Sequence, residues 1–327
     1  MGVAVEELHE PVWEGGGRNW EAGAGAAVRL ARAQARLLRR RPAARPDAVI
    51  VGYPGHLDLP AARRAARGAP VVLNPLVSLA DTLVEDRGRF RQGSLPARAL
   101  RAVDRFALRG ADLVVADTEA HANHLARLAD LPPERVAVCF VGAEERIFSP
   151  PWRPREPVLF VGKLIPLHGL ETILAAATLL PGLPLRVVGS GQLDAALTRR
   201  PANVEWIPWI PYERLGAVLR AARAALGVFG SSPKAARVIP NKVFQALACG
   251  TPVVTADTPA ARELLADGDS ALLVPPGDAE ALAGALWRLA SDGELARRVG
   301  QRGHAAYRER ASEDALGRRW RGLLERL

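Results

Sequence analysis

The chain alternates short apolar runs with longer helix-forming segments, and this alternation limits the folds open to it. Runs that are apolar throughout predict strands covered on both faces. Helical patterns of ten or more residues between most of them are typical of doubly wound parallel α/β sheets. Strands are predicted at residues 3–5, 48–51, 70–73, 112–116 and 135–140, and then at 157–161, 185–188, 204–207, 224–228, 252–255 and 271–274.

The divide between two such sheets falls at Ser149–Pro157, where four of nine residues are proline. Proline at this density continues neither a helix nor a central strand, so the segment is a linker. We therefore predict an N-terminal domain over residues 1–150 and a C-terminal domain over 151–303. A final helix over 304–327 is expected to pack back toward the first domain. Ligands of this architecture bind in the cleft between the carboxyl ends of the strands.

Composition narrows the class of protein. No apolar run approaches the roughly 18 residues that span a bilayer. The first residues carry acids where a secretion signal carries bases, so we expect a cytoplasmic protein. Cys139 and Cys249 lie in apolar surroundings and are interpreted as small core residues in a reducing compartment.

The net charge of +9 is spread through both halves, with 21 arginines against 18 acids before residue 151. A spread charge with only 5% aromatic residues argues against a nucleic-acid partner. One basic cluster stands out at Ala24–Arg41, where arginines alternate with apolar residues in a good helix former. Two interpretations stay open: a helix lying on an anionic membrane surface, or a solvated basic face.

Only three of the 44 basic residues are lysine: Lys163, Lys234 and Lys242. A lysine ammonium is a compact point charge that binds phosphate, unlike the planar arginine fork. Lys163 and Lys242 lie in strand–loop–helix segments and indicate an anion site. Lys234 belongs to the loop before the second segment and is interpreted as a rim charge.

The first of these segments runs through Gly162, Lys163 and His168. A strand ends, glycine permits close backbone approach, and a helix with free amides opens after His168. A strand running into a glycine turn follows at Gly189 and Gly191, and this signal is weak by itself.

The second segment contains Pro240, Asn241, Lys242 and Gln245. Pro240 pre-sets a helix start, and Asn241 is the expected N-cap. Lys242 then stands in the first turn, where the helix dipole disfavours a cation. A bound anion would explain this lysine. Gln245 lies one turn further along, on a similar face.

Together these motifs resemble the donor-binding domain of GT-B glycosyltransferases, specifically the retaining family 4 (glycosyl transferases group 1). The resemblance is close over about Pro157–Leu289 and includes the helix that ends in ALACGTPVV. It is looser in the first half, mainly at residues 111–118. It implies two Rossmann-like doubly wound domains facing a cleft. The implied activity moves a sugar from a UDP- or GDP-sugar to a glycan or lipid-linked acceptor, in envelope polysaccharide or glycolipid synthesis. Neither a cofactor nor a metal is implied.

The resemblance also assigns residues. His168 stands where the family has a second lysine for the diphosphate, and the family's paired glutamates fall at Arg237 and Gln245. The uncharged Gln245 can still accept a hydrogen bond from a ribose hydroxyl. Trp209 follows a strand near the expected base pocket, where it either stacks on the base or packs in the core. The implied donor-binding set is Gly162, Lys163, His168, Gly189, Gly191, Trp209, Asn241, Lys242, Val243 and Gln245.

The predicted catalytic set is Lys163, Lys242 and His56. The two lysines would stabilise charge on the leaving diphosphate. His56 follows a buried strand and is interpreted either as a cleft residue or as a plain surface histidine. His121 and His124 are spaced i, i+3 on a helix, but no third metal ligand is apparent.

The first half departs further from the family. Polar residues Asn74, Ser78 and Asp81 follow a strand where acceptor contacts are expected, although an ordinary loop and helix cap explains them equally. The chain begins at what resembles the family's second strand, Val3–Val5, so we expect the N-terminal domain to lack the first strand. That gap, with Arg237 and Gln245, leaves an alternative: a GT-B-like binding or scaffold subunit that has lost catalysis.

Overall fold

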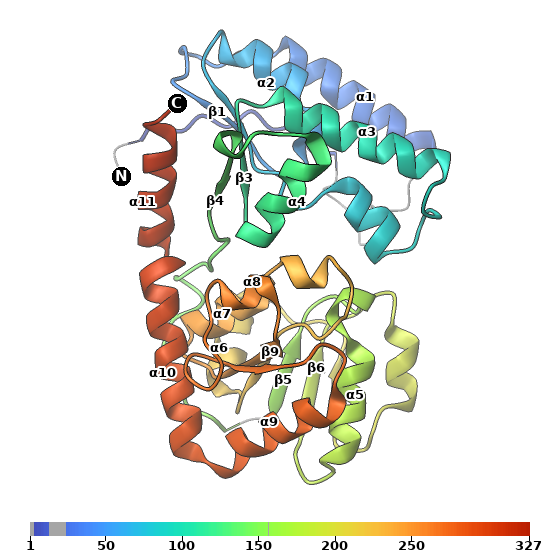
Figure 1. The fold of residues 1–327 in the computed structure, drawn as a ribbon, viewed down its shortest axis with the longest axis vertical. Coiled ribbons are helices and arrows are strands. Elements are labelled where there is room, and N and C mark those ends of the chain that lie inside the picture. The colour runs from blue at the N-terminus through green and yellow to red at the C-terminus, as the bar shows by residue number, and fades with distance from the viewer. Residues whose placement is uncertain (1–2, 13–23, 156) are drawn as a thin grey trace.

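The computed structural model describes residues 3–12, 24–155 and 157–327, which form two α/β domains stacked along the long axis (Figure 1). Both sheets are parallel, with strand order β1-β2-β3-β4 in the first and β10-β9-β8-β5-β6-β7 in the second. This confirms the predicted fold class. The strands are β1 Val49–Val51, β2 Val71–Leu73, β3 Leu113–Ala116, β4 Val136–Val138, β5 Val158–Val161, β6 Leu185–Val188, β7 Val204–Ile207, β8 Ala225–Leu226, β9 Val253–Ala256 and β10 Leu272–Val274.

Helices connect the strands, as the alternation of patterns predicts. The α-helices are α1 Ala24–Arg39, α2 Leu59–Ala66, α3 Leu95–Gly110, α4 Glu119–Ala129, α5 Leu170–Leu179, α6 Tyr212–Ala221, α7 Asn241–Ala248, α8 Pro259–Arg262, α9 Ala279–Ser291, α10 Gly293–Arg310 and α11 Glu313–Leu324. Shorter turns are η1 Gly55–Leu57, the π-helix η2 Asp81–Asp86, η3 Pro133–Arg135, η4 Pro166–His168, η5 Asp194–Arg199 and η6 Ala235–Arg237. None of the described helices is both long and apolar enough to span a membrane.

The predicted strand at Val3–Val5 is wrong. Val3 and Val5 are 59% and 86% exposed, and no described strand pairs with them. A short β-branched run forms a strand only where a ladder partner and a covering layer exist. The other ten predicted strands are present, most within a residue or two of the expected bounds.

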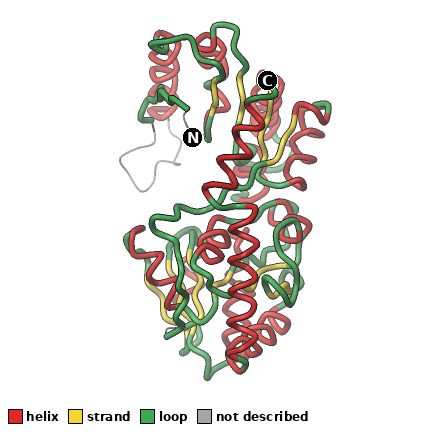
Figure 2. The backbone as a smooth tube through the Cα atoms, turned by 90° about the vertical axis from the view of Figure 1, so that its left-hand side faces the viewer, coloured by secondary structure: helices red, strands yellow, loops and turns green. Residues whose placement is uncertain are grey.

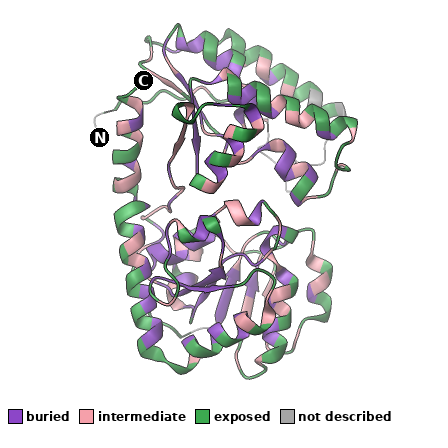
Figure 3. Cartoon of the chain, in the orientation of Figure 1, coloured by how far each residue is buried: buried purple, intermediate pink, exposed green. Residues whose placement is uncertain are grey.

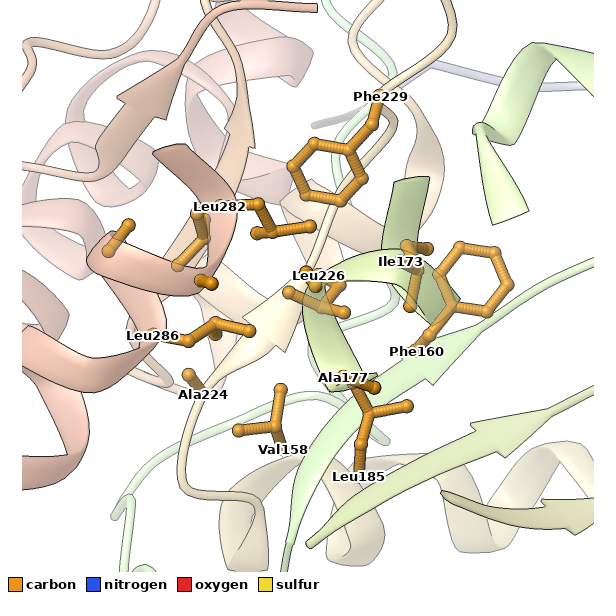
Figure 4. Packing of buried hydrophobic residues seen from close by; sticks show 14 of the residues in the cluster. Val158, Phe160, Ile173, Ala177, Leu185, Ala224, Leu226, Phe229, Leu282 and Leu286 are labelled. Atoms are coloured by element: carbon orange, nitrogen blue, oxygen red, sulfur yellow. The ribbon is translucent and has the colours of Figure 1, made fainter. Parts of the chain in front are cut away.

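The second sheet is covered on both faces, which explains its uninterrupted apolar strands. On one face Phe160 packs in a cluster with Ile173 of α5 and Leu286 of α9 (Figure 4). On the other face Phe244 of α7 and Leu219 of α6 belong to a second cluster. The strands are buried, and the outer faces of the helices are exposed (Figure 3).

The C-terminal helical pattern is two helices rather than the single predicted one. α10 packs beside α7 in the second domain, and the chain turns at Ser312, whose hydroxyl accepts the Ala315 N–H at the start of α11. Leu316 and Trp320 of α11 then pack with Val115 of the first sheet. The chain therefore returns to the first domain (Figure 2).

The carboxyl ends of the two sheets face each other. Thr118, just after β3, donates its hydroxyl hydrogen to the Arg237 carbonyl oxygen at 2.5 Å, and Arg237 lies beyond the end of β8. Glu263 of the second domain accepts the backbone N–H groups of Glu119 and Ala120 at 2.7 and 2.9 Å. Any site built on these strand ends is therefore shared by both domains.

Candidate active site where the two sheets meet

The loop after β5 brings three of the predicted residues together. Gly162 has a φ of +151°, a conformation that side chains rarely adopt. A Cβ atom at this position would lie 2.8 Å from the Lys242 Nζ and 3.3 Å from the His168 Cε1. Glycine is therefore required for the lysine to reach the end of β5, and the two segments singled out in the sequence meet here.

The glycine turn after β6 packs against the loop after β5. We call these two loops, together with the start of α7, the corner. The Gly162 N–H donates to the Val188 carbonyl oxygen at 2.9 Å. A Cβ atom on Gly189, whose φ is +136°, would overlap the Gly162 carbonyl oxygen. One on Gly191 would lie 2.8 Å from the Leu164 carbonyl oxygen. The two glycines of the weak motif thus permit the β5 and β6 loops to touch.

Lys242 is the most unusual group in the corner. Its side chain enters from the first turn of α7, is only 8% exposed, and places Nζ 3.8 Å from the centroid of the Phe160 ring. Among the residues the structure describes, none accepts a hydrogen bond from this Nζ. Burial lowers the pKa of Lys242 well below its usual value. The ring face offsets part of the cost of burial, but the three N–H donors stay unsatisfied.

The start of α7 adds further donors. Pro240 is the N-cap and its side chain makes no capping bond, so Asn241 is the first helical residue. The prediction of Asn241 as the N-cap is wrong, because the proline takes that position and fixes the entry angle. The first N–H groups of a helix have no partner within the regular helical pattern. Here the Val243 N–H donates to the Pro240 carbonyl oxygen at 2.8 Å, so the candidate donors are the N–H groups of Asn241 and Lys242. With Lys242 in the same turn, this is an arrangement suited to binding an anion.

His168 lies against the same ring, with a centroid separation from Phe160 of 5.6 Å. Burial and the nearby Lys242 charge lower the pKa of His168 to about 2, against the opposing hydrogen bond to Lys163. The ring is therefore neutral, and Nδ1–H donates to the Lys163 carbonyl oxygen at 2.5 Å. Nε2 is left as an acceptor, so His168 can donate to an anion only by taking up a second proton.

The remaining residues predicted to contact the donor have varied environments. Lys163 and Asn241 are exposed, Gln245 is half-buried and Val243 is buried. Trp209 is 74% exposed, so core packing is excluded for it.

Sequence reasoning did not single out two aromatic residues that contact this part of the structure. Trp206 of β7 donates Nε1–H to the Gly189 carbonyl oxygen at 2.9 Å, and Phe160 supplies the ring under Lys242. Both occur in predicted strands. Their only available signal was a position near a strand's carboxyl end.

His56 lies inside the first domain rather than on its surface. Its ring is 1% exposed, with Nε2 3.4 Å from Asp104 Oδ1 and Nδ1 3.4 Å from the Pro54 carbonyl oxygen. Burial lowers the pKa of His56, although Asp104 partly opposes this. Ser78 also donates to Asp104, at 3.0 Å, while Asn74 is half-exposed after β2. The surface interpretation of His56 is therefore wrong, and its catalytic role stays a prediction.

Asp81 begins the π-helix η2 and reaches across to the second domain. Its Oδ2 lies 2.9 Å from Arg237 Nη2 and 3.1 Å from His124 Nε2. Burial alone raises the pKa of Asp81, but the hydrogen bonds and charges of His124 and Arg237 outweigh it and hold the pKa below its usual range. His121 instead contacts Asp117 at 2.5 Å. The two histidines thus have different carboxylate partners.

Lys234 makes a second buried contact between the domains. Its Nζ lies 3.2 Å from Thr82 Oγ1 and 3.4 Å from Asp86 Oδ2, and the residue is 6% exposed. The interpretation of Lys234 as a rim charge is wrong, because η2 covers the loop that carries it. The three lysines thus have three environments: Lys163 exposed, Lys234 buried and paired, Lys242 buried and unpaired.

The fold is that of the GT-B glycosyltransferases. A sucrose-phosphate synthase from Thermosynechococcus elongatus superposes with a TM-score of 0.73 at 19% identity, covering 93% of this chain and 79% of that one. HepE from Anabaena, solved in complex with UDP-glucose, superposes with a TM-score of 0.71 at 18% identity, covering 91% and 82%.

Sequence comparison names the family. Residues 155–292 match Glycosyl transferases group 1 and residues 3–142 match the Glycosyl transferase 4-like domain; the chain belongs to this family. A D-inositol 3-phosphate glycosyltransferase of Mycobacteroides abscessus is 28% identical, over 77% of this chain and 59% of its own length. The lipopolysaccharide core biosynthesis glycosyltransferase LpsE of Rhizobium meliloti is 26% identical, over 80% and 77%. The chain thus spans less than two thirds of the length of that D-inositol 3-phosphate glycosyltransferase.

Proposed function

We propose that the protein is a retaining glycosyltransferase that moves a sugar from a nucleoside-diphosphate sugar to an acceptor. The observation that carries the proposal is the buried Lys242 ammonium without a hydrogen-bond partner, at a helix start and next to Gly162. A buried cation of this kind needs an anion, and a diphosphate is the anion that a lysine and free amides bind well.

In the proposed reaction the bond between the sugar and the diphosphate oxygen breaks while the acceptor oxygen attacks the same face. The acceptor's proton passes to the leaving diphosphate. Negative charge therefore grows on the diphosphate, and donors already in place stabilise it. Lys242 and the first amides of α7 would stabilise this negative charge from the buried side of the site, and Lys163 would do so from the exposed side. In this proposal the lysines neutralise the leaving group without a metal.

The donor and acceptor classes are proposed from the relatives. HepE was solved with UDP-glucose and with UDP and glucose, which supports a UDP-sugar here, with a GDP-sugar as the other choice. The name of LpsE places that relative in lipopolysaccharide core synthesis, which supports an envelope glycan or glycolipid as acceptor. Trp209, exposed just beyond β7, is the residue we propose to stack on the base.

The test is the turnover of Lys242→Ala with a panel of UDP- and GDP-sugars, followed as released nucleoside diphosphate. Losing one such donor costs about 3 kcal/mol of transition-state stabilisation, so turnover should fall roughly a hundredfold. Arg297→Ala, an exposed arginine on α10, is the control and should keep full activity. Near-normal turnover in the Lys242 variant would refute the assignment.

The same experiment separates the enzyme from the binding or scaffold alternative. A scaffold that kept the donor site would gain thermal stability with UDP or GDP and release no sugar from any donor. An enzyme would gain thermal stability with the nucleotide and would also release product from its donor. The two outcomes are distinguished by measuring thermal shift and product release on the same preparation.

A further inference from the structure

The outer surface of α3 carries an apolar stripe that nothing in the proposed reaction uses. Ala97, Ala107 and Leu108 face inward and are buried. On the opposite side Leu95 and Phe106 are 79% and 54% exposed. With two exposed alanines they follow one another at helical spacing: Leu95, Ala99, Ala102 and Phe106.

Arginines border this stripe along its length. Arg98, Arg105 and Arg109 lie along one side of it at helical spacing, and all three are exposed. Among the described residues no carboxylate pairs with Arg98 or with the half-buried Arg101. Arg109 pairs with Asp130 at 2.7 Å. The helix contains one acid, Asp104, which is fully buried. The exposed surface of α3 is therefore apolar and purely basic.

α1 repeats the arrangement. Ala33 is buried, while Val28 and Leu38 are 49% and 38% exposed on the other side. The exposed apolar positions are Val28, Ala31, Ala35 and Leu38, and the exposed arginines beside them are Arg29, Arg32, Arg36 and Arg39. Arg36 is paired with Glu10, and α1 itself contains no acid.

The two helices belong to one layer. α1 packs beside α2, and Arg63 of α2 donates to the Gly110 carbonyl oxygen at the end of α3 at 2.9 Å. In Figure 1 α1 lies along the end of the first domain that is remote from the second domain, and α3 is drawn just below it. We call the exposed residues of α1 and α3 given above the α1/α3 face.

We propose that the α1/α3 face binds the surface of a membrane rich in anionic phospholipid. Leu95 and Phe106 would enter the headgroup region while Arg98 beside them meets the lipid phosphates, and the half-buried Arg101, further round the helix, would add positive charge. Apolar residues in a stripe with arginine at its border are the composition of helices that lie in a membrane interface. The arginine stems can extend so that the charged heads stay at phosphate level. The inference stands on this surface alone and does not depend on the proposed reaction.

The location fits a lipid-linked acceptor. α3 begins nine residues after η2, the segment that holds Asp86 against Lys234 at the meeting point of the domains. A membrane under the α1/α3 face would thus lie against the domain whose strand ends line the candidate active site.

The experiment is co-sedimentation of the full chain with phosphatidylglycerol–phosphatidylcholine vesicles and with phosphatidylcholine vesicles. The wild type should bind the first far more tightly than the second, and salt should weaken the binding. The R98E/R101E variant should bind the anionic vesicles at least about tenfold more weakly, because each basic residue near such a surface contributes a several-fold factor. L95D/F106D should lose binding to a similar extent.

Matched controls carry the same chemical changes elsewhere. R297E/R298E reverses two exposed arginines of α10, and L179D places a carboxylate on the 52% exposed Leu179 of α5. Both should bind vesicles as the wild type does. All altered side chains are exposed or half-buried, so unfolding temperatures should change little and will show whether each variant is folded.

Three results would overturn the proposal. These are equal binding by R98E/R101E and R297E/R298E, equal binding to the two vesicle types, and absence of binding by the wild type. Sedimentation velocity tests whether the chain instead forms a dimer through the α1/α3 face. If the wild type fails to bind vesicles but forms a dimer that L95D/F106D abolishes, a second copy of the chain covers this face and the membrane proposal fails.

Discussion

The three lysines offer one substitution with three different expected outcomes. Replacing each by methionine keeps the length of the side chain and removes only the charge. In Lys242→Met a buried ammonium without a partner is lost, and its desolvation cost, which exceeds the about 1–3 kcal/mol of a neutral group because it is charged, is relieved. The cation–π contact with Phe160, worth about 0.5–2 kcal/mol, is lost as well. We expect the free energy of unfolding to rise by at least about 1 kcal/mol, and Tm by about 1–2 °C for each kcal/mol in a chain of 327 residues.

The same change at Lys234 should have the opposite sign. Its Nζ lies 3.4 Å from the carboxylate of Asp86, whose side chain is 3% exposed. Removing one partner leaves the other as an uncompensated buried charge, which costs about 3–5 kcal/mol. Lys163 is exposed, so Lys163→Met should change the free energy of unfolding by no more than about 0.5 kcal/mol.

The pH dependence supplies a second check. Burial lowers the folded-state pKa of Lys242, so the folded protein binds fewer protons than the unfolded chain between the two pKa values. The destabilisation is complete below the folded-state pKa and fades as pH rises toward the unfolded value near 10.4. The advantage of Lys242→Met should therefore shrink on going from neutral to alkaline pH.

The assay is thermal and urea unfolding of the three variants without nucleotide, repeated with saturating UDP. UDP should stabilise the wild type, by about 2.7 kcal/mol at a hundredfold excess over Kd, and Lys242→Met much less. A Lys242→Met protein that unfolds more easily than the wild type would refute the reasoning, because it would mean that the ammonium is satisfied in the nucleotide-free protein.

Two further predictions concern the same corner. A bound diphosphate should raise the lowered pKa values of Lys242 and His168, so UDP binding should take up protons at pH values between the free and the bound pKa. Titration calorimetry over a range of pH, in buffers of different ionisation enthalpy, measures this, and buffer-independent heats at every pH would contradict it. Gly189→Ala would drive a Cβ atom into the Gly162 carbonyl oxygen and should cost about 1–3 kcal/mol or more of the free energy of unfolding. A wild-type Tm for that variant would show that the β5 and β6 loops can separate.

Much of the fold could be read from local patterns. Ten of eleven strands and the linker followed from apolar runs and prolines, because burial on both faces of a parallel sheet leaves its mark on consecutive residues. Lys242 was found for a similar reason. A cation in the first turn of a helix opposes the dipole, and that conflict is visible in sequence.

The failures have a common physical cause. Val3–Val5 has the composition of a strand but pairs with none of the described strands, and a ladder partner is not a local property. His56 was placed after the correct strand, yet its burial beside Asp104 depends on residues 48 positions away. A loop position in sequence says little about which segment covers it in space.

The sequence by itself determined the class of fold, the two domains and the glycine and lysine positions of the candidate site, since each has a local signature. Only the tertiary structure decided what surrounds those positions. It placed Phe160 beneath Lys242, paired Arg237 with Asp81 across 156 residues, and buried Lys234 against Asp86. Charge becomes costly or stabilising according to burial and partner, and both are set by segments that meet only when the two sheets face each other.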